Sequence, residues 1–487
     1  MATRRRGFVR RMCAAVWRLV SWLWPGNKGG DTYRNWSRTV SFKRERYCEP
    51  TTEGAVIKIV EEARNANKHV RTVGAGHSFS QLVVTPDTLV SLDKLKTAPT
   101  FDGHRVTVPA GMSLKDVIKT LKKNKPPLAL KNLGSITRQS IAGAISTGTH
   151  GTGLTLGSLS SHVVGVRLID GKGGVRTYTD KDKDGDYLSA ARISLGALGI
   201  LTEVTLECVD FYKLEFNAYV GSLDDVLAKL DCLAQDNMRM LFWWLLPPPP
   251  WTKLRHKVIL IIKNPVGHPP RCLEDAKDLG DPEALGRRLG RPEHNVTKVL
   301  PHLLPLVEKW PGPGFHRFLH FTADYDEVLT LPMPEPPFPQ LYHRECEYAL
   351  PADPASPGKE ARAALRSFQR VADESDLNLL MPVEVRFVAN DEVLLSPAYK
   401  QDVCYIGASA LTCHAPVPQD NATEIFTRFE PIMREHKGKP HWGKIFSLTR
   451  DDVKALYPGT YKAFTDIRDE LDPDRVFANS MLDELFP

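Results

Sequence analysis

The chain has 487 residues, which at roughly 100–200 residues per domain predicts two to four structural units. Its composition, 42% hydrophobic and 25% charged residues, is that of a globular protein and excludes a disordered, collagen-like or coiled-coil chain. Residues 1–30 hold seven basic and no acidic residues, so the remainder, with 57 basic and 58 acidic residues, has a net charge of −1. This distribution argues against a nucleic-acid partner, and no run of apolar residues is long enough for a polytopic membrane protein.

The N-terminus predicts a targeting or membrane-associating segment over residues 1–30. An arginine cluster precedes residues 12–24, which are apolar except for Arg18 and Ser21. Thirteen helical residues span about 20 Å, short of a bilayer core of about 30 Å. A signal peptide, a signal anchor, an Arg-rich transit peptide and an interfacial helix all stay open. We expect a membrane-associated protein of the endoplasmic reticulum or mitochondrion.

Cysteines, histidines and sequons give no strong site signal. The eight cysteines include no CxxC pair, so we expect mostly buried free thiols and no zinc site. His316 and His320 have the spacing of a metal pair on a helix, but no third ligand motif accompanies them, and we predict no metal. Glycosylation triplets begin at Asn35, Asn295 and Asn421, a number that chance alone supplies.

The periodicity of apolar residues predicts an α+β chain with two domains, over residues 31–210 and 211–487. Residues 264–314 are rich in Gly and Pro and are expected to be mostly loop. The predicted elements are, in chain order, a helix over 53–67, strands over 70–73, 88–92 and 105–108, a helix over 113–122 capped by Ser113, strands over 163–169 and 201–206, a helix over 360–375, a strand over 383–388 and a helix over 422–436.

A glycine turn follows the predicted strand over 70–73. It reads Gly74-Ala75-Gly76-His77-Ser78, and Phe79 stands where a dinucleotide fingerprint would have its third glycine. Such a turn offers backbone N–H groups to a phosphate. A tight turn with an incidental histidine is the alternative.

A second loop region, residues 133–153, is dense in Gly, Ser and Thr. Ile136, Ile141 and Ile145 are interspersed, which favours an ordered loop over a flexible linker. Backbone of this kind suits close contact with a large polar ligand.

Further motifs stand near the C-terminus. Residues 381–387 read MPVEVRF and are followed by LLSP at 394–397; residues 439–444 read KPHWGK; and LDP at 471–473 leads to Asn479. Together with the two glycine-rich loops, these motifs resemble the sugar-1,4-lactone oxidase family of the vanillyl-alcohol oxidase/p-cresol methylhydroxylase FAD superfamily. The resemblance runs from about Asn35 to Pro487.

The resemblance implies a two-subdomain FAD-binding domain of the p-cresol methylhydroxylase type over 31–210. It also implies an α+β substrate (cap) domain over 211–487, whose C-terminal tail packs back near the flavin. FAD is expected to be bound covalently through His77. The cofactor-binding residues that it implies are Gly74, Ala75, Gly76, His77, Ser78, Gly134, Ser135, Thr137, Ser140, Gly143, Thr147, Gly148, His150, Gly199, Ile200 and His441.

The implied activity is FAD-dependent oxidation of a gulono-, galactono- or arabinono-1,4-lactone by hydride transfer to flavin N5. Molecular oxygen would accept the electrons and give hydrogen peroxide, and the product would lead to ascorbate or an analogue. An alditol oxidase of the same family is the alternative. A membrane-associated flavin protein without turnover is a third reading, which the joint retention of Glu384, Arg386 and Lys444 argues against.

Four residues are the expected catalytic set. Glu384 and Arg386 lie two apart on a predicted strand and therefore share a face, where they could hold a lactone or polyol; a surface ion pair is the alternative. Lys444 could stabilise developing charge or, with a lowered pKa, act as a base. Ser135 could bond the flavin edge or the substrate.

Gly134 is expected to control oxygen access. In the family that the chain resembles, this position is thought to be Gly in oxidases and Ala in dehydrogenases. The alternative is that Gly134 serves only a backbone conformation with positive φ.

Overall fold

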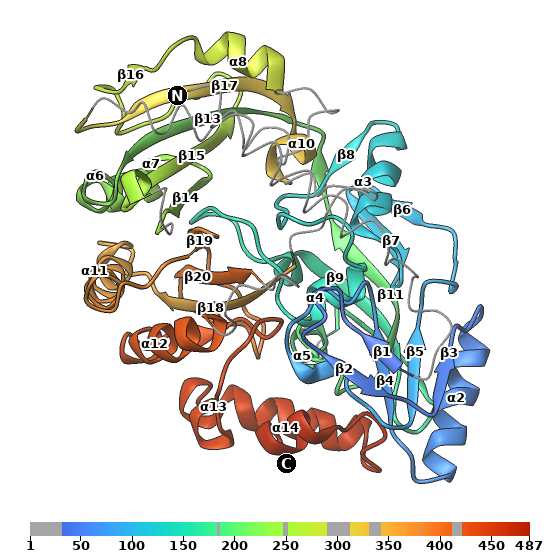
Figure 1. The fold of residues 1–487 in the computed structure, drawn as a ribbon. Helices are drawn as coiled ribbons and strands as arrows, with labels where there is room; N and C mark the ends of the chain where they lie inside the picture. The colour runs from blue at the N-terminus through green and yellow to red at the C-terminus, as the bar shows by residue number, and fades with distance from the viewer. Residues whose placement is uncertain are drawn as a thin grey trace, which may run out of the picture.

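The computed structural model describes residues 32–182, 186–246, 252–289, 312–330, 342–379, 381–411 and 421–487, and these form a mixed arrangement of helices and sheets (Figure 1). The predicted N-terminal segment, residues 1–30, lies outside this range. Within the described residues, no helix has the length and apolar character needed to cross a membrane.

A small parallel sheet lies near the start of the described chain. Its order is β3 (Arg46–Cys48), β5 (Thr88–Ser91) and β4 (Val70–Val73). Helix α2 (Glu53–Asn65) makes the crossover from β3 to β4, and Thr52 caps it by accepting a hydrogen bond from Ala55 N at 3.2 Å. A hairpin of β1 (Thr32–Arg34) and β2 (Ser41–Lys43) precedes this unit.

A five-stranded antiparallel sheet follows and shares one hydrophobic core with the parallel sheet. Ser113 caps helix α3 (Leu114–Lys123) by accepting from Asp116 N at 3.1 Å, as predicted. The strand order is β10 (Val175–Thr179), β9 (Val163–Ile169), β11 (Ile200–Glu207), β7 (Arg105–Pro109) and β6 (Thr100–Asp102). The helices of this part are α3 (Leu114–Lys123), α4 (Ile141–Ser146) and α5 (Tyr187–Arg192), with a short pair β8 (Leu128–Ala129) and β12 (Val209–Asp210) and 3₁₀ turns η1 (Gln81–Val83) and η2 (Leu159–His162).

A nine-stranded sheet, here called the cap sheet, organises the second half of the chain. Its order is β16 (Lys277–Asp278), β17 (His316–Asp324), β13 (Lys213–Ser222), β15 (Lys257–Pro265), β14 (Met240–Trp244), β19 (Val383–Val388), β20 (Val403–Leu411), β18 (His343–Pro351) and β21 (Lys439–Pro440). Short elements beside it are η3 (Thr252–Leu254), α8 (Pro282–Leu289) and α10 (Tyr325–Leu329).

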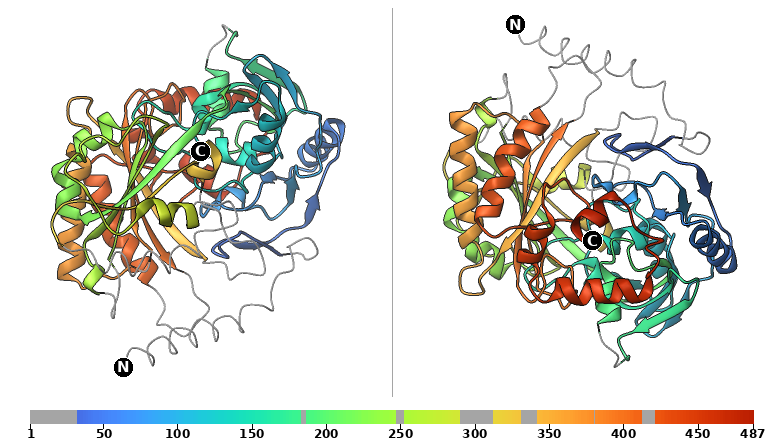
Figure 2. Two further views of the ribbon diagram at one scale, coloured as in Figure 1. Left: turned by 90° about the horizontal axis from the view of Figure 1, so that it is seen from above. Right: turned by 90° about the horizontal axis from the view of Figure 1, so that it is seen from below.

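Four helices cover one face of the cap sheet, and Figure 2 shows α11 and α12 in orange on its outer side. They are α6 (Leu223–Ala228), α7 (Leu230–Asp236), α11 (Lys359–Glu374) and α12 (Asn421–Glu435). Strand alternation divides the side chains: in β14, Phe242 and Trp244 enter this helix-covered core, whereas Leu241 and Trp243 face the other side. The second face of the cap sheet is therefore not covered by these four helices, and part of it packs on Leu279 and Leu285.

The C-terminal helices α13 (Arg450–Leu456), α14 (Thr460–Leu471) and α15 (Ser480–Leu485) return to the first half. Buried Arg71 of β4 donates to the carbonyls of Leu195 and Gly196 at 2.7 and 2.8 Å and also bonds Phe477 O. Asn479 donates to the carbonyls of Gln81, Leu82 and Val84. The C-terminal tail thus fixes the backbone beside the first glycine turn.

The predicted elements agree with the structure to within one or two residues at their ends, because each has a strong local apolar pattern. Two details of the structure add to the sequence analysis. His316 and His320 lie on strand β17, not on a helix, and His320 Nδ1 is 3.0 Å from Asn217 Oδ1. The described part of 264–314 holds α8 in addition to loops.

Free thiols are confirmed for four of the six cysteines in the described ranges, Cys48, Cys208, Cys346 and Cys404. The remaining two, Cys232 of α7 and Cys272, form a disulfide with Cα atoms 6.3 Å apart. The sequence did not reveal this pair, because 40 residues separate its members and only the fold brings them together.

Candidate active site

A cavity of about 620 Å³ lies between the two glycine-rich loops and the open face of the cap sheet. Its walls come from the first turn, the second loop, residues 194–201 and cap strands β14, β15, β18, β19 and β20, with the 441–444 segment closing one side. Segments far apart in sequence therefore meet around one space of cofactor size.

The first glycine turn is in tight contact with the second loop. A Cβ at Gly74 would lie 2.1 Å from Ser140 Oγ, so any larger residue would push the loops apart. Ser140 in turn caps α4 by accepting from Gly143 N at 3.3 Å. The two loops thus form one continuous backbone surface with a helix N-terminus in it.

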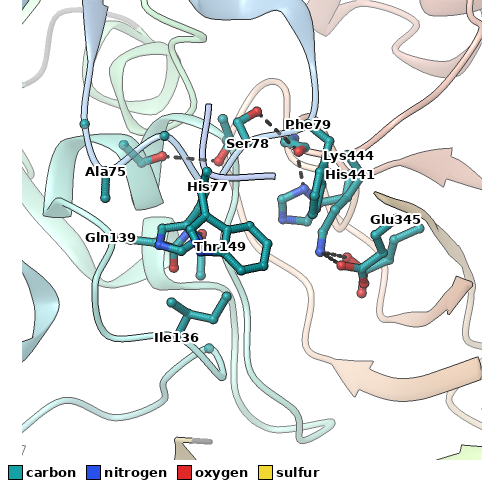
Figure 3. Close-up of a pocket in the computed structure, with 18 of the residues that line it drawn as sticks. Ala75, His77, Ser78, Phe79, Ile136, Gln139, Thr149, Glu345, His441 and Lys444 are labelled. Carbon is teal, nitrogen blue, oxygen red and sulfur yellow. Dashed lines mark hydrogen bonds and ion pairs between the residues drawn. The ribbon is translucent and has the colours of Figure 1, made fainter. Parts of the chain in front are cut away.

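His77 projects from this turn into the cavity (Figure 3). Its Nδ1 is buried and has no hydrogen-bond partner among the described residues. Burial, with the positive charge of Arg138 nearby, lowers the pKa of His77 to about 4. The imidazole is therefore neutral at physiological pH, with a lone pair on one nitrogen.

Most of the predicted cofactor-binding residues line the cavity. Gly74, Ala75, Gly76, His77, Ser78, Gly134, Ser135, Ser140, Gly143, Thr147, His150, Gly199 and His441 do so. Three others do not. Thr137 accepts a backbone bond from Lys115, Gly148 packs against Ile193, and Ile200 is buried in the β11 core.

Glu384 and Arg386 share the cavity face of β19, as the strand spacing predicted. They form a close ion pair, and their side chains are only 17% and 12% exposed, so this is not a surface pair. Arg386 Nη2 donates to Ser135 Oγ at 2.9 Å, and Trp243 Nε1 donates to Glu384 Oε1 at 2.9 Å. Burial alone would lower the pKa of Arg386, but the negative charges of Glu384, Glu347 and Glu345 together outweigh it and the pKa is raised.

Lys444 reaches the cavity beside two carboxylates of β18. It forms a close ion pair with Glu345, toward which it points in Figure 3, and its Nζ is 3.8 Å from Glu347 Oε2. Burial alone would lower the pKa of Lys444, but Glu345 and Glu347 outweigh it and the pKa is raised. The alternative of a base with a lowered pKa is therefore not supported, and Lys444 has the character of a fixed positive charge.

Behind Lys444 lies a fully buried group of His150, Glu347 and His441. His150 Nδ1 is 3.0 Å from Gly151 O and its Nε2 is 3.4 Å from Glu347 Oε1. Burial lowers the pKa of His441 to about 3, and its Nδ1 accepts from Gly443 N at 3.0 Å. Although three such ligand atoms could hold a metal, each already has a protein partner, so we describe them as a hydrogen-bonded network.

Sequence reasoning missed Trp36, Trp243, Glu345 and Glu347. Strand β18 reads HRECEYALP, and its alternation places His343, Glu345 and Glu347 on the cavity face while Cys346 and Tyr348 enter the core. The signal in the sequence was the alternation of acidic and apolar residues on one strand. A carboxylate on a buried strand needs a charged or hydrogen-bonding partner, so this alternation could have indicated a polar site.

Comparisons with known proteins identify the family of the chain. The family profile of D-arabinono-1,4-lactone oxidase matches residues 204–485, and that of an FAD binding domain matches residues 45–179. The chain belongs to the D-arabinono-1,4-lactone oxidase family. It is 32% identical to L-gulonolactone oxidase of Scyliorhinus torazame, over 94% of this chain and 98% of that one.

Two further similarities bear on activity and fold. L-gulono-1,4-lactone dehydrogenase of Mycobacterium tuberculosis is 30% identical over 92% of this chain and 97% of that one. The crystal structure of cholesterol oxidase from B. sterolicum has a TM-score of 0.71 at 18% identity, covering 96% of this chain and 99% of that one. The latter similarity shows a common fold alone. The family resemblance and the α+β fold predicted from sequence are confirmed.

Proposed function

We propose that the protein oxidises an aldono-1,4-lactone at a CH–OH group, with FAD as hydride acceptor and molecular oxygen as the final acceptor. The observation that carries this proposal is the convergence of Glu384, Arg386, Lys444 and His77 on one cavity. Relatives named for gulono- and arabinono-lactones support the substrate class.

The residues present fit FAD. The close contact between Gly74 and Ser140 holds the two glycine-rich loops side by side, and both loops line the cavity with backbone that can approach a large polar ligand. The buried, unpartnered Nδ1 of His77 fits a covalent bond to the flavin, which we propose as the mode of attachment. FAD, when bound, supplies the acceptor for the hydride and the electrons for oxygen.

The cap residues would bind and orient the lactone. Arg386 and Ser135, already hydrogen-bonded to each other, present donors toward the cavity, while Glu384 accepts from Trp243 and can accept from a substrate hydroxyl. Lys444 is held charged by Glu345 and Glu347, so it would stabilise negative charge on the substrate oxygen as the hydride leaves.

The test is hydrogen peroxide release by purified protein on gulono-, galactono- and arabinono-1,4-lactones, with xylitol and sorbitol in parallel. Release on lactones supports the proposal. Release on the polyols alone would assign alditol oxidation, and flavin reduction without peroxide would assign a dehydrogenase.

We also propose that residues 1–30 associate with a membrane of the endoplasmic reticulum or mitochondrion. The support is the arginine cluster followed by the apolar run of 12–24. Sedimentation with anionic vesicles should be lost on deletion of residues 1–30 while flavin content stays the same; co-sedimentation of the truncated chain would contradict the assignment.

A further inference from the structure

The β1–β2 hairpin packs directly on the first glycine turn. Trp36 N donates to Gly76 O at 2.8 Å, and Asn35 Nδ2 donates to Ser78 O at 2.9 Å. The two carbonyls that flank His77 are therefore both held by the hairpin. Gly76 has φ +69°, and a Cβ there would lie 2.7 Å from Tyr33 Oη, so hairpin and turn are in close contact.

Asn35 is a structural residue despite standing in a glycosylation triplet. It is 4% exposed. Its Nδ2 also donates to Thr39 Oγ1 at 2.9 Å, and its Oδ1 accepts from Val40 N at 3.0 Å. The side chain thus closes the hairpin loop and leaves no room for a glycan.

The hairpin also supplies an aromatic wall for His77. The Trp36 indole lies 5.1 Å from the imidazole, centroid to centroid, with 33° between the ring planes. On its other sides the indole meets Tyr342 at 5.6 Å and His343 at 5.3 Å, both edge-on, and it lines the cavity. Trp36 is therefore wedged between the turn that presents His77 and the cap strand opposite.

We propose that Trp36 is a positioning residue for the covalent bond between His77 and the flavin, which makes the 32–43 hairpin part of the flavin site. The hairpin precedes residue 45, where the match to the FAD binding domain begins. This inference rests on the covalent attachment proposed above. An imidazole on a glycine turn can rotate, whereas one packed against an indole keeps its unpartnered Nδ1 in one direction.

The covalent bond forms by oxidation of the flavin methyl group. A C–N bond forms between His77 Nδ1 and the 8α-methyl carbon of the flavin, while one C–H bond of that methyl and the imidazole N–H bond break. The two electrons and two protons stay with the flavin, which is left reduced. Molecular oxygen then takes both and leaves as hydrogen peroxide.

The experiment compares total with covalent flavin in full-length wild type, Trp36→Ala, Trp36→Phe and Trp36→Leu. Total flavin is read from absorbance of the native protein, and covalent flavin from the acid-precipitated pellet and from a protein mass increased by one FAD. Trp36→Ala and Trp36→Leu should form the bond about tenfold more slowly or worse, because small misplacements of reacting atoms have large effects on rate. They should still bind FAD non-covalently, and Trp36→Phe should stay near wild type.

Trp243→Phe is the matched control. Trp243 is a second tryptophan that lines the same cavity, but it donates to Glu384, and its substitution does not alter Trp36. It should lose activity but keep covalent flavin. Wild-type rate and extent of covalent attachment in Trp36→Ala, or in Trp36→Leu if the alanine variant does not fold, would overturn the inference. Flavin lost from the wild type in acid would refute the covalent bond itself. A covalently loaded wild type that oxidises no lactone would refute the proposed activity and leave the inference standing.

Discussion

Ser135 and Arg386, 251 residues apart in the chain, are joined by a hydrogen bond of 2.9 Å across the cavity. Ser135 belongs to the second glycine-rich loop and Arg386 to cap strand β19, so this bond links the two walls of the site. Arg386 Nη2 also pairs with Glu384. A ligand entering here meets a donor whose orientation is already fixed from both halves of the fold.

Removal of either cap cation should slow the reaction more than it reduces flavin binding. We expect Arg386→Ala and Lys444→Met to lower kcat by about 10²–10³, the range found when a transition-state charge stabiliser is lost. Flavin content and kcat are measured on the same preparations. Lys439→Met is the matched control: Lys439 lies in the same KPHWGK segment but stacks over Tyr457 and does not line the cavity. Equal losses of flavin and activity would assign the two cations a folding role.

Replacement of Gly134 by alanine should slow the reaction of the reduced flavin with oxygen. The positive-φ alternative is contradicted, since Gly134 is not among the glycines with left-handed backbone. A Cβ there would lie 2.8 Å from Thr149 Cγ2, so Gly134→Ala must displace that methyl group. We expect slower reoxidation by oxygen with little change in reduction by the lactone, measured by stopped flow.

Thr149→Ser supplies the control for this prediction. It removes the opposing methyl but keeps the hydroxyl that accepts from Gln139 Nε2 at 3.1 Å. The double variant Gly134→Ala/Thr149→Ser should keep the slow reoxidation and regain any lost thermal stability. Normal oxygen reactivity in a stable double variant would eliminate the gate.

Acid should destabilise the fold through buried neutral histidines, of which His162 is the clearest outside the cavity. It is 8% exposed, and burial, with Lys131 nearby, lowers its pKa to about 4. An unfolded histidine titrates near 6.5, so the unfolded state takes up the proton first. The contribution of His162 to the free energy of unfolding should therefore be nearly constant above about pH 7 and fall as the pH drops toward 4, by about 2 kcal/mol at pH 5.

Urea unfolding of wild type and His162→Leu at pH 8 and pH 5 measures this contribution. The variant should lose about 2 kcal/mol less than wild type between the two pH values. His268→Gln, at an exposed histidine, is measured in parallel as the comparison for removing a histidine from the surface. If wild type and His162→Leu lost the same free energy of unfolding between pH 8 and pH 5, His162 would not be a source of the acid destabilisation.

The cap disulfide should contribute measurable stability. Cys232 and Cys272 are 40 residues apart in the sequence, and their bond closes this segment into a loop. The loss of chain entropy in the unfolded state should raise the free energy of unfolding by about 4 kcal/mol. Cys232→Ser/Cys272→Ser should lower the cap's unfolding midpoint without changing flavin content. Peptide mapping without reductant should recover the linked peptides from the wild type, and recovery of two alkylated thiols would contradict the bond. Cys208→Ser is the control for loss of a buried free thiol.

Local patterns in the sequence determined much of the fold. The 3.6-residue period of 53–65 and the cap at Ser113 specify their helices, because each signal acts within one or two turns. The same holds for the shared face of Glu384 and Arg386, which follows from the two-residue period of a strand wherever that strand lies. The two glycine loops were also identifiable, since few other residues tolerate such close backbone contact.

Two features of the site depend on the tertiary structure: the charge state of Lys444 and the aromatic wall that Trp36 forms beside His77. The pKa of Lys444 depends on two carboxylates about 100 residues away, and their charges reverse the direction that burial alone would give. Trp36 meets His77 through a hairpin whose sequence suggested only a glycosylation triplet. The charge state and the orientation of a side chain depend on all of its neighbours. Here these neighbours come from segments far apart in the sequence, and no local pattern predicts that they meet.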